Sequence, residues 1–473
     1  MTITTTASFD AGSCLRLLHH FVGPVDRPRV ERIVERAGER FVASLEIPRD
    51  LRHLDDARMA WDIAELRGTP IRYPRPTSTV RVIDLFCGCG GFAWGMRNAL
   101  LHQGIRPVFT HAFDVDEKAL EVYSSNFSPQ VTSQDSVAMQ VDYSIRLLNG
   151  RARFAYPPEI LAGAETLLAE VGRTDFVIAG PPCQGHSNLN NHTRRKDPRN
   201  LLYLTTVALA VSLRARNILI ENVLDVQNDH FMVVQRAHDL LESSGYQVDS
   251  IVLDGPSAGL PQTRKRFFLM ASLGDAPRSL LVQRQFEVAK VRTVMDVIGD
   301  LEGLSSTSVF DSAPKLSRTN IERIDWLFEN NAYNLANDQR PDCHKDGHSY
   351  PSVYGRLYPD QPAGTITTGL NSPGRGRYIH PTQRRTITPH EAARIQGFPD
   401  TFLFNGETIG RNSIAKLIGD AVPPLFGMIT GLAFVLAKAP KKIKTDLSMP
   451  QSSQPSSLAH SYNASSSSSS DPF

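Results

Sequence analysis

The segment with the clearest chemistry is residues 180–187, Gly-Pro-Pro-Cys-Gln-Gly-His-Ser, which follow the apolar run 176–179. Two adjacent prolines fix φ and lack N–H donors, so they end a strand and aim Cys183 rigidly. A cysteine acts as a nucleophile in its thiolate form, whose pKa is about 8.5 in a free side chain. A lone cysteine is usually a buried structural residue. This costly setting nevertheless favours a nucleophile at Cys183.

A carboxylic acid and two cations follow other apolar runs. Residues 217–220 lead into Glu221, and Arg264 and Arg266 stand just before the run 267–271. A carboxylic acid near a cysteine nucleophile suits general-acid chemistry on an electron-poor ring. The arginines supply fixed positive charge for an anionic ligand or an acidic side chain. These residue types together predict nucleophilic catalysis assisted by an acid.

A glycine-rich turn follows the apolar run 80–86. Gly88, Gly90 and Ala93 fit the G-x-G-x-x-G/A spacing of dinucleotide-binding turns. A strand, such a turn and a helix together let backbone N–H groups approach a nucleotide closely. Taken alone, this string fits a simple tight turn almost as well, and it fits an NAD dehydrogenase equally well.

Two aspartates strengthen the interpretation as a cofactor site. Asp114 stands 26 residues after Gly88 (114 − 88), at the end of the run 108–113, and Asp135 follows residues 131–134. A carboxylate at such a strand end can accept hydrogen bonds from ribose hydroxyls. Turn or helix-cap roles are about as common for isolated aspartates. The hydride-transfer alternative is disfavoured by the setting of Cys183.

The elements that must position these residues alternate between strands and helices. Predicted strands are 80–86, 108–113, 176–179, 218–220 and 267–271. Their alternation with longer helical stretches indicates an α/β fold with a mostly parallel sheet covered on both faces. Ligands of such sheets bind at the carboxyl ends of the strands. The glycine turn, Cys183 and Glu221 all follow such ends.

The domain organisation is inferred from changes of pattern along the chain. Apolar spacing predicts helices over residues 29–45 and 51–66, followed by a proline-rich linker. Residues 273–382 lack clear periodicity, as expected of a loop-rich domain, and residues 465–470 are all serine. The predicted parts are 1–78, a helical N-terminal extension and linker; 79–272, the first part of the α/β domain; 273–382, a separate loop-rich domain; 383–440, a return to the α/β domain; and 441–473, a disordered tail.

Composition is that of an ordinary globular protein, with 41% hydrophobic and 21% charged residues. No apolar run approaches the roughly 18 residues of a membrane span, and the N-terminus lacks a secretory pattern. Five cysteines are too few and too irregular for a disulfide framework. A cytoplasmic, nucleoid-associated enzyme is expected. A net charge of +2 requires any nucleic-acid contact to use local basic segments, such as 192–199 and 375–385.

In chain order, these segments resemble the motifs of the cytosine-C5 DNA methyltransferase family, of the bacterial type. The matching segments are 84–92, Asp114, Asp135, 180–185, 221–223, 262–266, 391–400 and 418–423. The resemblance implies a Rossmann-like, S-adenosylmethionine-dependent methyltransferase sheet with a smaller inserted target-recognition domain. It implies that residues 79–272 and 383–440 form the catalytic domain and residues 273–382 the target-recognition domain. It also implies that Cys183 attacks C6 of a flipped-out cytosine while Glu221 contacts the N3 edge. C5 then accepts the methyl group, and a base removes the C5 proton.

The resemblance implies a set of residue roles. The catalytic residues are Cys183, Glu221, Arg264 and Arg266. The cofactor-binding residues are Asp84, Phe86, Gly88, Gly90, Gly91, Asp114, Val115, Asp135, Pro181, Asp420 and Ala421. The DNA-binding residues are Gln184, Ser187, Arg194, Arg195, Arg199, Arg375 and Arg377. The expected partners are double-stranded DNA and a cognate restriction endonuclease, and the expected state is a monomer. The biological roles that fit are restriction–modification, phage defence and epigenetic marking.

Two departures from the family pattern and three rival functions remain. Asp420 stands where the family usually has Asn, and His186 where Phe is common. One rival is the family branch that methylates transfer RNA, although the insert of about 110 residues favours duplex DNA. A second is a binding protein without catalysis, which the intact Cys183 and Glu221 disfavour. A third is zinc binding by Cys343-His344-x-x-x-His348, where a fourth ligand is missing. No metal is therefore expected.

Overall fold

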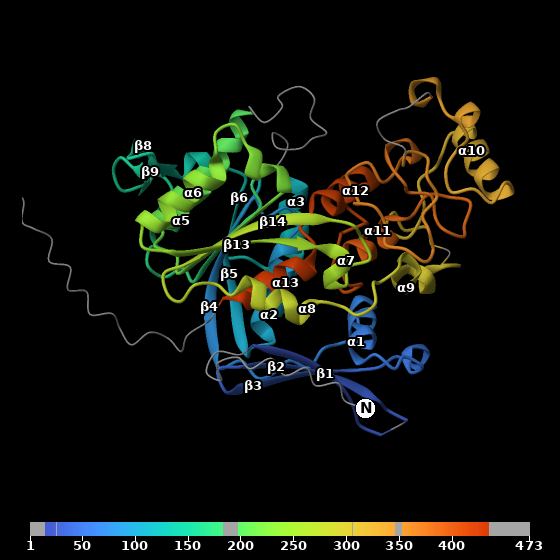
Figure 1. The fold of residues 1–473 in the computed structure, drawn as a ribbon, viewed down its shortest axis with the longest axis horizontal. Coiled ribbons are helices and arrows are strands. Elements are labelled where there is room, and N and C mark those ends of the chain that lie inside the picture. The colour runs from blue at the N-terminus through green and yellow to red at the C-terminus, as the bar shows by residue number, and fades with distance from the viewer. Residues whose placement is uncertain (1–14, 25, 183–196, 305, 346–351, 435–473) are drawn as a thin grey trace, which may run out of the picture. The chain divides into compact units, whose positions relative to one another are not determined.

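The computed structural model describes residues 15–24, 26–182, 197–304, 306–345 and 352–434. Its centre is a seven-stranded sheet in the order β13-β14-β12-β11-β4-β5-β6 (Figure 1). The strands are β4 Ser78–Leu85, β5 Ile105–Phe113, β6 Val131–Ser133, β11 Phe176–Ala179, β12 Asn217–Asn222, β13 Gln247–Asp254 and β14 Lys265–Ser272. The strands from β12 to β6 run parallel, whereas β14 is antiparallel to both β12 and β13. The predicted α/β fold class is confirmed.

Helices cover both faces of this sheet (Figure 1). They are α2 Gly91–Leu101, α3 Glu117–Phe127, α4 Glu165–Leu168, α5 Leu202–Ser212, α6 Val233–Ser243, α7 Gly255–Ala258, α8 Ser279–Phe286 and α13 Pro424–Ala433. Helices α11 Pro389–Gln396 and α12 Arg411–Asp420 pack against each other to one side of the sheet (Figure 1). On β14, Phe267 and Leu269 pack into the core shared with α5 and α6. Phe268 faces the opposite side, against Phe92 of α2 and Phe426 of α13. Burial on both faces explains the nearly continuous apolar runs of the sequence.

Helices α2 and α13 approach closely because small residues line their contact. A Cβ atom added to Gly95 would lie 2.0 Å from the carbonyl oxygen of Pro424, and one on Gly91 would lie 2.3 Å from that of Val422. No side chain fits at either position. The chain after the insertion is therefore locked onto the helix that begins at the glycine turn.

The predicted helix over residues 29–45 is wrong. Residues 16–46 form an antiparallel sheet of β1 Arg16–Val22, β2 Arg29–Arg36 and β3 Glu39–Glu46. Ala37 and Gly38 both have positive φ, at 48° and 79°, as a two-residue hairpin turn requires. Val30, Arg32 and Val34 alternate on a buried face. A charged residue is not expected on a buried face, so Arg32 hid the two-residue period of a strand in the sequence. The remaining apolar residues have a spacing that also fits a helix.

The second predicted N-terminal helix is present but shorter, as α1 Ala57–Leu66, which begins where the Asp56 side chain accepts from two backbone N–H groups. Residues 273–382 contain helices α8, α9 Val294–Ile298 and α10 Arg318–Glu329 between irregular segments. A smaller ribbon pairs β7 Val141–Asp142 with β10 Glu159–Ile160, and a hairpin joins β8 Ile145–Leu148 to β9 Arg151–Phe154. All described residues belong to one compact unit, Met1–Val435. The five predicted domain ranges stay predictions, and 441–473 lie outside the described residues.

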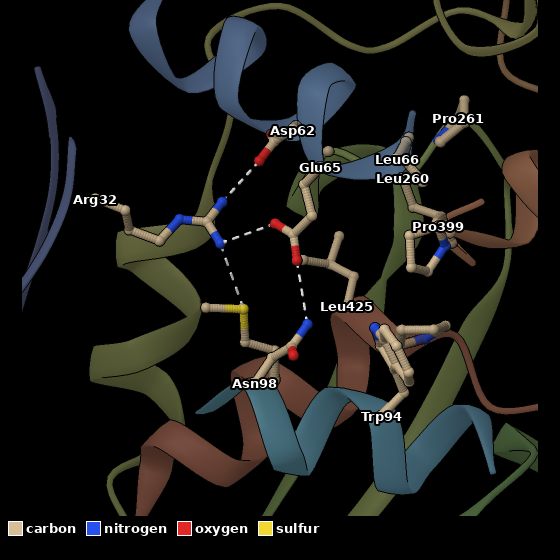
Figure 2. A pocket seen from close by; sticks show the side chains of 14 residues that line it. Arg32, Asp62, Glu65, Leu66, Trp94, Asn98, Leu260, Pro261, Pro399 and Leu425 are labelled. Atoms are coloured by element: carbon tan, nitrogen blue, oxygen red, sulfur yellow. Dashed lines mark hydrogen bonds and ion pairs between the residues drawn. The ribbon is translucent and has the colours of Figure 1, made fainter. Parts of the chain in front are cut away.

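A buried ion network joins the N-terminal sheet and α1 to the catalytic fold (Figure 2). The Arg32 guanidinium contacts Asp62 at 2.9 Å and Glu65 at 3.4 Å. Glu65 also accepts hydrogen bonds from Trp61 at 2.8 Å and from Asn98 of α2 at 3.1 Å. Beside these groups lies a cavity of about 80 Å³, walled by apolar side chains of the catalytic fold. Burial raises the pKa of Glu65, and Arg32 opposes that rise.

Within the described residues, no helix is both long and apolar enough to span a lipid bilayer.

The network predicts a pH-dependent loss of stability in an Arg32→Met protein. The free energy of unfolding should fall by about 3–5 kcal/mol at pH 8, because Glu65 loses its buried counter-ion. A carboxyl group whose pKa is raised by folding binds more protons in the native state. Stability is therefore regained as pH falls, and the defect should be smaller at pH 5.5. Urea unfolding at both pH values measures this.

Arg40→Met is the matched control, because Arg40 is 59% exposed and its ion pair with Glu35 spans 4.0 Å. Its unfolding free energy should stay within about 0.5 kcal/mol of the wild-type value. A defect of Arg32→Met that is equal at both pH values would show that lost packing, rather than lost charge, is responsible.

Candidate active site at the carboxyl edge of the sheet

The glycine turn between β4 and α2 is built from left-handed backbone. Phe86, Gly88 and Gly90 have φ of 56°, 53° and 97°. The Gly88 N–H donates to Asp114 Oδ2 at 2.8 Å, and Asp114 Oδ1 accepts from the Asp116 N–H at 2.9 Å. A Cβ atom on Gly88 would meet nothing within 4 Å, so the outer surface of the turn is open. The turn thus offers a cradle, with a carboxylate at its rim.

The neighbouring strand ends complete this cradle. Val115 is 76% exposed beyond the end of β5. Asp135 is exposed beyond β6, and its Oδ2 accepts from the Ser133 hydroxyl at 3.0 Å. Open backbone at the turn, an apolar surface and two carboxylates suit a nucleoside with ribose hydroxyls. S-adenosylmethionine carries such a nucleoside, so the residues present fit it.

Asp84 lies beneath the turn. Its side chain is 1% exposed, and burial raises its pKa well above the ordinary value. Tyr123 of α3 is fully buried beside it, and the Tyr123 hydroxyl lowers the pKa of Asp84. This geometry supports the turn from behind, on the side away from the open cradle.

Glu221 is the buried acid of the site. It ends β12 with Asn222, is 8% exposed, and its Oε1 lies 2.9 Å from Nε of Arg266 on β14. Burial raises the pKa of Glu221, while Arg266 and then Arg264 oppose the rise. A Cβ atom on Gly180 would lie 3.7 Å from Glu221 Oε2. The carboxyl group therefore abuts the backbone that leads into Pro181, Pro182 and Cys183.

Cys183, Gln184, Ser187, Arg194 and Arg195 lie outside the described residues, as does His186. The approach to Cys183 is described: Pro181 is buried, and its carbonyl accepts from the Asn222 amide at 3.3 Å.

Cysteines Cys87 and Cys89 are buried, and burial raises the pKa of both thiols, that of Cys89 to about 12. A thiol with so high a pKa stays protonated near neutral pH and is a poor nucleophile. Of the predicted zinc ligands, Cys343 is exposed and His348 lies outside the described residues. Another cluster, on α6, includes Asp239, which accepts the Ala152 N–H at 3.0 Å and so serves packing.

Arg264 is 2% exposed and binds two distant segments of the chain. Its guanidinium donates to the carbonyl oxygens of Ile366 at 3.0 Å, Gly419 at 3.2 Å and Ala421 at 2.9 Å. The contacts of Arg264 in the structure are thus with the protein backbone, whereas those of Arg266 are with Glu221.

Two glutamines extend this network, and the sequence analysis did not single them out. Gln262 donates to Gln396 Oε1 at 2.6 Å and accepts the Ile366 N–H at 2.9 Å. Gln396 in turn donates to the Ala421 carbonyl at 2.7 Å. All these atoms are buried. Gln262 lies in the matched segment 262–266 and Gln396 in the matched segment 391–400, and these positions could have marked both residues as candidates.

Asp420 ends α12, and its side chain is 54% exposed. Its Oδ2 lies 3.3 Å from Lys416 Nζ, which also contacts Asp116 at 3.1 Å. The departure from Asn at this position therefore brings a surface ion pair next to the end of β5. Ala421 is buried, and its carbonyl oxygen accepts hydrogen bonds from Arg264 and Gln396.

Of the predicted DNA-binding arginines, three lie in described segments. Arg199 is half exposed, with Nη2 at 2.6 Å from Asp197. Arg375 is exposed. Arg377 donates to the carbonyl oxygens of Tyr333 at 2.8 Å and Arg356 at 2.7 Å, and burial lowers its pKa.

Comparison with known proteins agrees with this geometry. The family model described as C-5 cytosine-specific DNA methylase matches residues 80–433. Type II methyltransferase M1.BsuMI of Bacillus subtilis is 40% identical over 358 residues, which cover 75% of this chain and 80% of that protein. Type II methylase M.HgiDII of Herpetosiphon aurantiacus is 29% identical over 358 residues, covering 74% and 93%.

Among solved structures, the S. pombe Dnmt2 methyltransferase matches with a TM-score of 0.49 and 16% identity, over 75% of this chain and 98% of that chain. The family match spans well over half of the chain, and the Bacillus subtilis relative exceeds one third identity over most of both proteins. The chain belongs to the C-5 cytosine-specific DNA methylase family and is an S-adenosylmethionine-dependent DNA (cytosine-5)-methyltransferase.

Proposed function

We propose that Cys183 is the nucleophile and Glu221 the acid of this methyl transfer. The observation that carries the proposal is the buried Glu221 carboxyl group, which abuts Gly180 and is held by Arg266. Burial raises the pKa of the Glu221 carboxyl group, and a higher pKa makes this group better suited to share or donate a proton to a ring nitrogen. Cys183 follows Gly180 by three residues in the sequence, which supports a role for Cys183 together with Glu221.

The reaction uses these groups in turn. The Cys183 thiolate forms a bond to C6 of the cytosine while Glu221 protonates or hydrogen-bonds N3, and electron density moves to C5. When bound, S-adenosylmethionine would supply an electrophilic methyl group, and its S–CH3 bond would break to leave the neutral thioether S-adenosylhomocysteine. Once C5 carries the methyl group, a base removes the C5 proton, the bond from C6 to sulfur breaks, and the thiolate is restored. The target base leaves the stack, because its C6 and C5 are inaccessible within a duplex.

We propose different roles for the residues predicted around the cofactor. Gly88, Asp114, Val115 and Asp135 face the open cradle and would contact S-adenosylmethionine, whereas Gly90 packs against Phe127 and would shape the turn. Asp84, Gly91 and Ala421 are buried and would support the turn. Phe86 and Pro181 join the turn to the catalytic edge, and Asp420 contributes charge through Lys416.

Residues 273–382 are proposed as the target-recognition domain for duplex DNA, with exposed Arg199 and Arg375 at phosphates. Gln184, Ser187, Arg194 and Arg195 are proposed as further contacts in the segment after the nucleophile. The names of the type II relatives support a role beside a cognate endonuclease in restriction–modification. A monomeric enzyme, associated with the nucleoid, completes the proposal.

Fluorine at C5 should trap the covalent adduct. A duplex with 5-fluorocytosine at the target site cannot lose a C5 proton, so the protein should stay bonded to it, only when S-adenosylmethionine is present. Denaturing gel electrophoresis detects the adduct. Cys183→Ala should give none, which controls for thiols such as Cys343. An adduct with 5-fluorocytosine transfer RNA and none with duplex DNA would assign the enzyme to the RNA branch.

Glu221→Gln should slow turnover by about 10²–10⁴, the usual cost of a lost general acid. In the wild-type protein, kcat should fall as pH rises through the raised pKa of Glu221, and this alkaline limb should vanish in the variant. Glu242→Gln is the control, since Glu242 is half exposed on α6. A rate of Glu221→Gln within about twofold of wild type would mean that Glu221 is structural.

Lysine substitutions should separate the two arginines. Arg264→Lys loses the fork that reaches three carbonyl groups, so its unfolding free energy should fall by at least about 2 kcal/mol. Arg266→Lys keeps a cation near Glu221, so its stability should change by less than about 1 kcal/mol while kcat falls. Thermal unfolding and methyl-transfer kinetics test both. The reverse pattern would exchange the roles proposed for the two side chains.

A further inference from the structure

The proposed recognition domain has little conventional core. Its own cluster contains four fully buried apolar residues, Ile324, Leu327, Leu335 and Ile379. Beyond α10, the described residues 330–345 and 352–382 contain only single 3-10 turns and isolated bridges. Other apolar residues of this range, such as Leu357, Ile366 and Leu370, pack into the core of α11 and α12. Near α10, a further set of interactions holds the irregular segments in place.

That set is a row of alternating stacked side chains, which we call the arginine–aromatic ladder. Its members, in spatial order, are Arg377, Tyr358, Tyr333, Arg356, Phe328 and Arg384. The two tyrosine rings are stacked, with centroids 4.4 Å apart and planes inclined by 21°. The Arg356 guanidinium lies 5.0 Å from the Tyr333 centroid and 4.0 Å from that of Phe328. Such contacts are attractive because the faces of aromatic rings are electronegative.

The N–H groups at the edges of these guanidinium groups also form hydrogen bonds or ion pairs. Arg356 Nε donates to the Pro381 carbonyl at 2.6 Å, and Arg377 Nη1 donates to those of Tyr333 and Arg356. Arg384, at the end of the ladder, pairs with Asp325 of α10 at 2.9 Å. Each arginine therefore uses its flat face for stacking and its N–H groups for binding backbone or carboxylate. Lysine has the charge but neither the plane nor the fork.

The ladder fixes the segment that carries the exposed Arg375. Arg377 follows by two residues, and its guanidinium is bonded to the loop at Tyr333. On the other side, a Cβ atom on Gly374 would lie 2.9 Å from the Tyr354 hydroxyl. The Tyr354 ring is itself covered by Arg323 at 5.2 Å. Residues 374–377 are thus held between the Tyr354 and Tyr358 side chains, and Arg375 is exposed while its aliphatic stem lies against Gly369.

We propose that the arginine–aromatic ladder preorganises the segment 374–377 for duplex DNA, which makes Tyr333, Arg356 and Arg377 positioning residues for DNA recognition. The inference rests on the proposed function of residues 273–382. Ladder arginines would touch no phosphate; they would determine where Arg375 lies. A loop that is already ordered loses less conformational freedom on binding, so its affinity is higher.

The test compares two variants that remove a stacking contact of the ladder with one variant that keeps the aromatic ring and one surface control. Arg356→Lys and Tyr333→Leu should each raise KM for duplex DNA at least tenfold, with kcat within about threefold of wild type. Tyr333→Phe keeps the ring and should behave as wild type. Arg318→Lys is the matched surface control, since Arg318 is 94% exposed. S-adenosylmethionine affinity, measured by calorimetry, should be unchanged in all four proteins.

The salt dependence of DNA binding separates positioning from direct contact. A lost phosphate contact reduces the slope of log K against log salt by about 0.9. Arg356→Lys and Tyr333→Leu should therefore keep the wild-type slope despite weaker binding. Unchanged KM in both variants would overturn the proposal. A shallower slope would also overturn it, because the segment would then have lost its phosphate contacts altogether.

A separate arm tests the assumption beneath this inference. Arg375→Ala should weaken DNA binding and lower the slope by about 0.9, as a phosphate contact requires. If Arg375→Ala binds DNA as wild type does while the ladder variants do not, the assignment of Arg375 fails, but the ladder still acts on another contact. If neither class of variant changes DNA binding, residues 273–382 do not form the recognition domain.

Discussion

The buried guanidinium of Arg264 needs acceptors, and the chain supplies them from segments about 100 and 155 residues away. A buried charge without partners is costly, so the fold is stable only when Ile366, Gly419 and Ala421 return to β14. Gln262 and Gln396 close the same network from either side. These contacts tie the segments around Ile366 and Ala421 to the start of β14.

The same contacts connect the segment around Ile366 to the glycine turn. The Ala421 carbonyl binds Arg264, and the next carbonyl, that of Val422, sits against Gly91 at the start of α2. Glu221 stands between, held by Arg266 two residues from Arg264. A displacement of β14 would thus move the acid and the support of the glycine turn together. Helix α1 adds a further constraint, because Glu65 binds Asn98 near the carboxyl end of α2.

Much of this arrangement followed from the sequence, where residue type and local pattern agreed. The strands that end near the glycine turn, Pro181 and Glu221 were predicted because both sheet faces are apolar there. The N-terminal hairpin was missed because its inward face contains Arg32, whose partners come from α1. Arg377 was assigned to DNA by its charge alone. Its bonds to Tyr333 and Arg356 depend on a packing that no local pattern encodes.

The net charge of this protein does not indicate how it binds a polyanion such as DNA. Its 51 basic and 49 acidic residues nearly cancel, and several arginines are committed to internal structure. Arg32, Arg264 and Arg394 are each at most 3% exposed and bind protein carboxylates or carbonyls. The positive charge available to DNA must therefore come from a small number of exposed side chains, each at a defined place. Since such contacts cannot compensate for one another, their positions matter more than their number, and rigid stacking is a direct way to fix them.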